Sequence, residues 1–200
     1  EAGKTYYIST GLTVASKLTI QGGAVIKMGG AGRFTLAQGG SVVTETTAFR
    51  PATIVSKNCN SIGAVIAGST GTPARGDCQR GFELDYQEQG TLEHLKIAHS
   101  WLAVRIYSGH WTIRHSVLRD HYTGLEARGN SVVSVENVLF KNNLNWPIRM
   151  YVSATAVPQV SMAHITVDGS PYYAVRYDLV GTDPATSALT VVNSIFQGYG

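Results

Sequence analysis

Charged residues are scarce in this chain of 200 residues: they make up 14% of it, against roughly 25% in typical globular proteins. The net charge is +3, and the basic residues stand singly rather than in runs. Because a protein that neutralises phosphates needs clustered Lys and Arg, we expect no nucleic-acid partner. No apolar segment approaches the roughly 20 residues of a membrane-spanning helix, so we expect no membrane span.

Cysteine is almost absent. The only two, Cys59 and Cys78, bracket a polar stretch without a strong strand signal, and we interpret about 57–81 as a loop insertion. Two unrelated free thiols are one possibility. The other is a disulfide, which would close a loop of about 20 residues and stabilise the fold by about 3 kcal/mol in the chain-entropy model. We predict the disulfide, and therefore an oxidising, extracellular or cell-surface location. With no histidine nearby, a zinc site is not expected.

Glycine is abundant, with 22 residues, and Thr, Ser, Val and Asn are frequent. This mixture is typical of strands joined by tight turns. Helix signals are weak because β-branched residues and glycines interrupt every candidate segment. The composition therefore predicts an all-β protein.

One short motif recurs five times: an apolar residue, any residue, Asn or His, two further residues and a second apolar residue. The copies cover 92–97, 113–118, 135–140, 162–167 and 191–196, and their polar centres are His94, His115, Asn137, His164 and Asn193. The centres are 21, 22, 27 and 29 residues apart. Repetition in this range indicates a solenoid, in which each repeat buries its apolar face against its neighbours.

A second strand accompanies each repeat. Aligned with one another, these strands give two apolar columns: Val104, Leu125, Ile148 and Val175, then Ile106, Ala127, Met150 and Tyr177. Their spacings of 21, 23 and 27 residues match the first series. Residues 18–27 and 34–43 are near copies of a strand, a Gly-Gly corner and another strand. We therefore predict one domain over 1–200, made of about eight coils of parallel β-strands.

The repeated unit and the stretch "LTIQGGAVIKM" at 18–28 resemble the right-handed parallel β-helix proteins of the pectate-lyase-like superfamily. Within it, the chain is most similar to repeat domains of large secreted or surface proteins of bacteria. The resemblance covers nearly the whole chain and implies the architecture. It implies no particular activity, because the superfamily includes lyases, hydrolases, esterases, tailspikes, adhesins and modules without known chemistry.

The polar centres of the motif are expected where the chain turns a corner, because Asn tolerates the left-handed backbone region better than most residues. Stacked in successive coils, these side chains form a hydrogen-bonded ladder. The alternative is a metal site at His94 and His115. That pair supplies two ligands and no carboxylate, so we predict a structural ladder and no metal.

The outward face of the second strand series is the candidate binding surface. Its two columns are Arg105, Glu126, Arg149 and Arg176, then Tyr107, Arg128, Tyr151 and Asp178. Tyrosine offers an apolar face and a hydroxyl to a sugar ring, and arginine pairs bidentately with carboxylates or sulfates. This pattern favours polysaccharide binding. The alternative is a surface ion-pair ladder that contributes little.

Catalytic signatures of the superfamily are missing, among them the clustered Asp residues of pectate lyases and the adjacent acidic pair of polygalacturonases. We predict no catalytic residue and no cofactor, and interpret the protein as a non-catalytic extracellular structural or adhesive module. The alternative is a polysaccharide lyase or glycoside hydrolase acting on an acidic polysaccharide, with Arg149 or Arg176 beside Glu126 or Asp178. Coil spacing places these carboxylates about 12 Å apart, too far for paired hydrolysis.

Two further expectations concern a corner and the chain's last residues. His99, Asp120 and His121 come together at one corner, which is typical of a hydrogen-bonded turn and less so of a catalytic group. Residues 191–200 stop inside a copy of the motif, without a helix or polar strand to cover the last coil. We therefore expect a segment of a longer rod, or end-to-end self-association.

Overall fold

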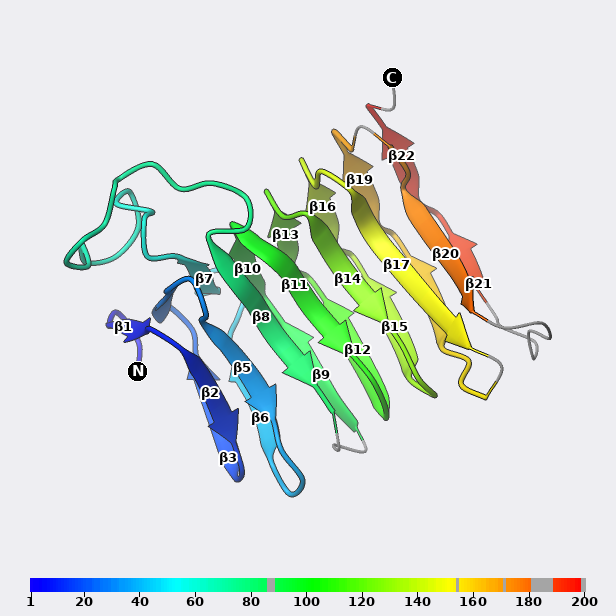
Figure 1. Ribbon diagram of the computed structural model, residues 1–200, viewed down its shortest axis with the longest axis horizontal. Coiled ribbons are helices and arrows are strands. Elements are labelled where there is room, and N and C mark those ends of the chain that lie inside the picture. The colour runs from blue at the N-terminus through cyan, green and yellow to red at the C-terminus, as the bar shows by residue number, and fades with distance from the viewer. Residues whose placement is uncertain (86–88, 154, 171, 181–188, 199–200) are drawn as a thin grey trace.

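The computed structural model describes residues 1–85, 89–153, 155–170, 172–180 and 189–198. Within these ranges every regular element is a strand, and no helix has the length and hydropathy to cross a membrane. The chain is a parallel β-solenoid of about seven turns, with the strands of successive coils side by side (Figure 1). About eight coils were expected; the eight strands of the largest sheet enclose seven turns.

The strands of the described residues form four sheets. The eight-stranded sheet contains β1 (Thr5–Ile8), β4 (Val25–Met28), β7 (Ala52–Ser56), β10 (Leu95–Ala98), β13 (Val117–Arg119), β16 (Leu139–Lys141), β19 (Thr166–Asp168) and β22 (Ile195–Gln197). The seven-stranded sheet contains β2 (Gly11–Val14), β5 (Arg33–Leu36), β8 (Cys78–Leu84), β11 (Ser100–Ile106), β14 (Thr123–Ala127), β17 (Trp146–Ser153) and β20 (Val175–Val180). The five-stranded sheet contains β9 (Gln89–Glu93), β12 (His110–Arg114), β15 (Val132–Glu136), β18 (Gln159–Ala163) and β21 (Leu189–Val192). The two-stranded sheet pairs β3 (Lys17–Gln21) with β6 (Ser41–Glu45).

Strand register confirms the columns predicted from the sequence. The seven-stranded sheet pairs Val104, Leu125, Ile148 and Val175 in one column, and Ile106, Ala127, Met150 and Tyr177 in the next. The first apolar positions of the motif, Leu92, Ile113, Val135, Met162 and Val191, stack in the five-stranded sheet. Because side chains alternate along a strand, the apolar columns of the three faces meet in one core, and each fully buried Leu, Ile or Phe stabilises it by about 1.5–3 kcal/mol.

The motif's polar centres all adopt the left-handed conformation. Their φ angles lie between 48° and 55°, at His94, His115, Asn137, His164 and Asn193. Each N–H from His94 to His164 donates to a carbonyl of the following coil, at N···O distances of 3.0–3.2 Å. These corners therefore join the five-stranded and eight-stranded sheets while continuing the hydrogen bonding between coils.

A second left-handed column, which the sequence analysis missed, joins the eight-stranded and seven-stranded sheets. Its members are His99, Asp120, Asn142, Gly169 and Gly198, with φ between 52° and 78°. Their residue types differ from coil to coil, so no repeated letter marked the column in the sequence. His99 and Asp120, expected at a turn, do lie at this corner.

A polar column follows this second corner inside the core: Ser100, His121, Asn143 and Ser170, all buried. The Nδ1 atom of His121 accepts a hydrogen bond from the Ser100 N–H at 3.1 Å, and its Nε2 lies 3.0 Å from the Ile97 carbonyl oxygen. The His121 ring therefore provides hydrogen-bond partners for backbone groups on both sides of the corner, the Ile97 carbonyl before it and the Ser100 N–H after it. Burial lowers the pKa of His121 to about 4, because the charged form would be desolvated.

The long loop runs over 57–77, since β7 ends at Ser56 and β8 begins at Cys78. The expected end near 81 is therefore four residues too late. The Asp77 carboxylate fixes both ends of the loop by accepting hydrogen bonds from Ser56 Oγ at 2.8 Å and from the Ala74 N–H at 3.0 Å. The loop also covers Lys27, whose Nζ donates to the Cys59 carbonyl at 2.7 Å.

The predicted disulfide between Cys59 and Cys78 is wrong: both thiols are free and buried in this structure. Cys78 packs in the main core, whereas Cys59 packs in a small separate cluster with Val55 and Ala98 beneath the loop. Burial raises the pKa of the Cys78 thiol to about 12. Hydrogen bonds of Asp77, rather than a cross-link, hold the two ends of the loop together.

The near copies at 18–27 and 34–43 are not stacked on each other. Leu18 pairs with Val42, and Phe34 pairs with Leu12. The two segments lie 16 residues apart, which is less than one coil, so the second copy begins one sheet earlier than the first.

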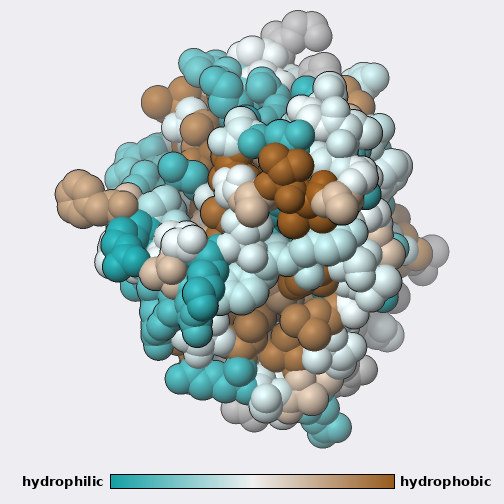
Figure 2. All heavy atoms as spheres, turned by 90° about the vertical axis from the view of Figure 1, so that its left-hand side faces the viewer, coloured by the Kyte–Doolittle hydropathy of each residue, from teal (hydrophilic) through white to brown (hydrophobic). Residues whose placement is uncertain are grey.

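The first and last coils expose apolar core positions. Figure 2 shows apolar residues gathered in the middle of the N-terminal end, where a cavity of about 340 Å³ is lined by Tyr6, Leu12 and Phe34. At the opposite end Val191 is 40% exposed, whereas Met162, its partner one coil earlier, is 1% exposed. A further coil or a second molecule would cover these residues, so both expectations about the last coil stay predictions.

Replacing Asn137 by Val tests the left-handed corner. A β-branched residue is strained at φ 49°, so we expect a loss of about 1–3 kcal/mol in the free energy of unfolding, measured by urea denaturation. Asn137→Gly is the matched control and should lose less than about 1 kcal/mol. Equal losses in the two variants would contradict the role of the backbone conformation.

Replacing His121 by Asn, the residue of this column in the following coil, tests the buried imidazole. The unfolded chain binds a proton on His121 below about pH 6.5, and the folded chain only near 4, so stability falls as the pH falls between these values, by about 3 kcal/mol. We expect this part of the pH dependence to vanish in His121→Asn and to persist in the exposed control His110→Gln. Identical pH profiles for wild type and His121→Asn would contradict the assignment.

Candidate functional site

The outward face of the seven-stranded sheet carries the residues expected there. Register pairs Arg105 with Glu126, Glu126 with Arg149, and Arg149 with Arg176. In the neighbouring outward column, Tyr151 pairs with Asp178. Parallel pairing thus brings one long polar side chain per coil into a row along the solenoid axis, with a step of about 4.8 Å.

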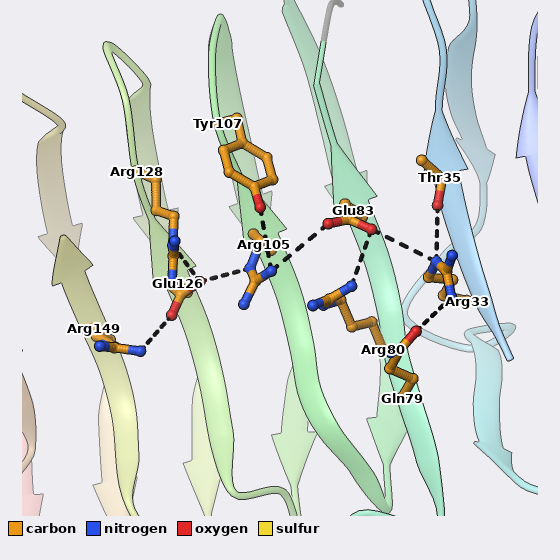
Figure 3. Close-up of polar contacts among 10 residues, drawn as sticks. All are labelled: Arg33, Thr35, Gln79, Arg80, Glu83, Arg105, Tyr107, Glu126, Arg128 and Arg149. Carbon is orange, nitrogen blue, oxygen red and sulfur yellow. Dashed lines mark hydrogen bonds and ion pairs between the residues drawn. The ribbon is translucent and has the colours of Figure 1, made fainter. Parts of the chain in front are cut away.

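Ion pairs join this row without a break across six strands, from β5 to β20. Glu83 lies 3.7 Å from both Arg33 and Arg105, and Arg105 Nε donates to Glu126 Oε1 at 2.6 Å (Figure 3). Arg149 continues the row: its Nη1 is 2.8 Å from Glu126 and its Nε is 2.6 Å from Asp178. Asp178 also contacts Arg176, which ends the row.

Glu126 is the centre of the row. It is 2% exposed and contacts three arginines, Arg105, Arg128 and Arg149, at 2.6–2.8 Å. Burial alone would raise the pKa of this carboxyl, but the hydrogen bond from Arg128 and the charges of the three arginines lower it below its usual value. Glu126 is therefore an ionised anchor beneath the guanidinium groups.

Aromatic rings lie between the arginines. The Arg128 guanidinium carbon is 4.5 Å from the centre of the Tyr151 ring, with Arg149 on the same ring at 5.7 Å. Trp146 likewise contacts Arg149 at 4.8 Å and Arg176 at 4.4 Å. Each of these rings is therefore in cation–π contact with two guanidinium groups. Tyr107 and Tyr151 thus contact arginines through their rings, and their expected role in sugar binding stays a prediction.

Sequence analysis missed four members of this face: Arg33, Arg80, Glu83 and Trp146. Glu83 was missed because the strand series aligned in the sequence begins at Val104, one coil after β8, and the first four residues of β8 were assigned to the loop insertion. Arg80 and Trp146 belong to a third outward column, shared with Leu102 and Thr123. On each strand, two consecutive residues point inward between this third column and the column of Arg105. Strict alternation of side chains therefore does not predict the third column. The small residues Gly81 and Ala103 at the bend are the feature of the sequence that indicates it.

Glu126 and Asp178 lie closer together than the roughly 12 Å expected from coil spacing. Both contact nitrogens of the single Arg149 guanidinium, because their side chains lean toward it from either side. Hydrogen bonds and the charges of nearby arginines outweigh desolvation and lower the pKa of both carboxyls. Neither is suited to be the protonated acid that glycoside hydrolysis requires.

The motif's polar column lines a separate groove of about 570 Å³. There the rings of His94 and His115 stack with their centres 5.1 Å apart, and the Asn137 amide nitrogen lies 2.9 Å from His115 Nδ1. His164 lines the same groove, and Asn193 continues the column into the last coil. Across the described ranges, no three His, Cys, Asp or Glu side chains gather as a metal site would require.

Comparison with known proteins gives no match: no family model, curated protein or solved structure is similar enough to this chain to be reported. The fold class is therefore established by the strand pairing itself.

Replacing Glu126 by Gln removes the charge that three arginines share. We expect the free energy of unfolding at pH 7 to fall by about 2 kcal/mol, since charge-assisted hydrogen bonds are lost at a buried position. The folded pKa of Glu126 is lowered, so its contribution is present above about 4.5 and is lost as the pH falls below that value. The difference in free energy of unfolding between wild type and Glu126→Gln, measured by urea denaturation, should therefore become smaller at acidic pH.

The matched control is Glu136→Gln, an exposed carboxylate that accepts a hydrogen bond from Ser134 Oγ. Its effect should stay within about 0.5 kcal/mol. The anchoring role of Glu126 would be contradicted if Glu126→Gln were as stable as wild type at pH 7, or if the difference in free energy of unfolding became larger at acidic pH.

Proposed function

We propose that this protein is a non-catalytic β-solenoid module that binds an acidic polysaccharide along the arginine face of its seven-stranded sheet. The observation that supports this most is the row of guanidiniums held by ion pairs with carboxylates of the same face, of which Glu126 is buried. Six arginines share the face with Glu83, Glu126 and Asp178, and Asp85 at the end of β8 adds a fourth carboxylate, so two positive charges remain in excess.

The anchored arginines keep unused donors. Arg149 uses two of its five N–H groups in its bonds to Glu126 and Asp178. Ion pairs below and aromatic rings between the guanidiniums fix them before a ligand arrives, which reduces the ordering cost of binding. A planar carboxylate or sulfate is the ligand group that such a fork accepts bidentately.

Location outside the cell belongs to the same proposal, because acidic polysaccharides are found at cell surfaces and in the extracellular matrix. The two free, buried thiols add no support to it. The resemblance to pectate-lyase-like β-helix proteins supports the proposal through architecture only.

A polysaccharide lyase or hydrolase is the second candidate, favoured by the same arginines at close distance to Glu126 and Asp178. The lowered pKa of both carboxyls argues against it for hydrolysis. Incubation with each acidic polymer, followed by absorbance of unsaturated products and by reducing-end release, distinguishes the two candidates. If the wild-type protein degrades one of these polymers and Arg149→Ala does not, the protein is an enzyme and the non-catalytic proposal is wrong.

Binding is tested by calorimetric titration with polygalacturonate, alginate and heparin, and with neutral dextran. We expect at least one acidic polymer to bind, dextran not to bind, and affinity to fall with rising salt because counterions screen the face. Arg149→Lys keeps the charge but loses the fork, so affinity should fall about tenfold, as for loss of a charge-assisted hydrogen bond.

Arg114→Ala is the matched control, since Arg114 is ion-paired with Glu93 at 2.8 Å on the five-stranded sheet. It should bind like wild type. Equal binding of dextran, or an equal loss in Arg114→Ala and Arg149→Lys, would rule out the arginine face as the binding surface.

A further inference from the structure

A second cavity lies at the corner where the end of the long loop meets the second left-handed column. It has a volume of about 520 Å³, and the polar residues lining it are Arg75, His99, Asp120 and Tyr122. It is distinct from the arginine face, because His99 and Asp120 precede β11 and β14 whereas Arg105 and Glu126 lie near the far ends of those strands.

The loop wall of this cavity is fixed in place. Arg75 Nε donates to the Asn142 carbonyl at 3.0 Å, which ties the loop to the corner. Gly76 follows at φ 79°, and a Cβ there would approach the Tyr122 ring to 2.8 Å. The glycine therefore allows the loop to pack directly on the aromatic ring, and the cavity is built before any ligand enters.

His99 lines this cavity and has one unpaired ring nitrogen. The residue is 7% exposed, and its Nδ1 atom has no hydrogen-bond partner within the described part of the chain. Buried polar atoms are almost always paired, so the unpaired Nδ1 of a residue that lines a cavity is unusual. Burial lowers the pKa of His99, which keeps the imidazole neutral, with one nitrogen able to donate and the other to accept.

The remaining polar groups are held in defined positions. Asp120 accepts a hydrogen bond from Arg119 Nη1 at 2.9 Å and one from the Asn142 amide at 3.4 Å. Arg75 uses only its Nε in the contact with Asn142, so its two terminal nitrogens can serve a ligand. The Tyr122 ring is tilted by 37° against the ring of Trp101, with the ring centres 4.2 Å apart. Trp101 is 55% exposed, and the two rings form an aromatic wall beside the cavity.

We propose that this corner cavity binds one sugar residue, a chain end or a branch, through Arg75, His99 and Asp120. Adjacent hydroxyl groups of a pyranose offer both donors and acceptors, which suits a guanidinium, a carboxylate and a neutral imidazole together. The apolar face of the ring packs on Tyr122. A cavity walled by the loop takes a single residue, whereas the flat arginine face takes the length of a polymer.

The test is an NMR titration of the ¹⁵N-labelled protein with galactose, glucose, rhamnose and galacturonic acid in the millimolar range. At least one sugar should shift the backbone amides of His99, Asp120 and Tyr122. His99→Asn keeps the left-handed corner, because Asn142 adopts the same conformation in the same column. His99→Asn and Arg75→Met should each weaken that sugar about tenfold or more, as expected for loss of a buried or charged hydrogen bond.

Two controls separate this site from the rest of the chain. Lys57→Met alters a basic residue of the same loop that bonds to the Gly68 carbonyl, and it should leave binding unchanged. Arg149→Lys should also leave it unchanged, so failure of the arginine face and failure of the corner cavity are distinguishable. The proposal is overturned if no sugar of the panel shifts the corner amides, or if His99→Asn and Arg75→Met, with native spectra, bind like wild type.

Discussion

Hydrogen bonds between the backbones of successive coils fix every other feature of this protein. Parallel pairing with a side-chain period of two places one column in the core and the next outside, so a slip of one residue would exchange them. From His94 onward, two left-handed corners per coil keep that register, and the later coils differ in the number of residues between β17 and β18 and between β20 and β21. Coil length can therefore vary without disturbing the columns.

The polar chemistry follows from this stacking. A row of guanidiniums one coil apart would repel itself, and the carboxylates of Glu126, which is buried, and of Asp178, which is half-buried, offset that repulsion. The resulting face is rigid and carries excess positive charge, which matches an extended anionic polymer better than a small molecule. The long loop, held by Asp77, adds a walled cavity at a different corner and so a second kind of contact.

Much of the fold could be predicted because repetition multiplies a weak signal: the column from Val104 to Val175 has the same register in sequence and in structure. Features that occur once could not. The cysteines of the loop pack in different clusters, which spacing alone does not reveal. Trp146 lies on the arginine face because two inward residues at the bend interrupt alternation. The short separation of Glu126 and Asp178 depends on side-chain direction, which backbone spacing does not determine.

Scalar couplings across hydrogen bonds, measured by NMR on the labelled protein, test the stacking most directly. In-register coils predict couplings from the amide nitrogens of His115, Asn137 and His164 to the carbonyl carbons of Glu136, Ala163 and Val192, each one coil further along. Couplings to other carbonyls, or rapid exchange of these amides with solvent, would contradict the stacked solenoid and both binding sites inferred from it.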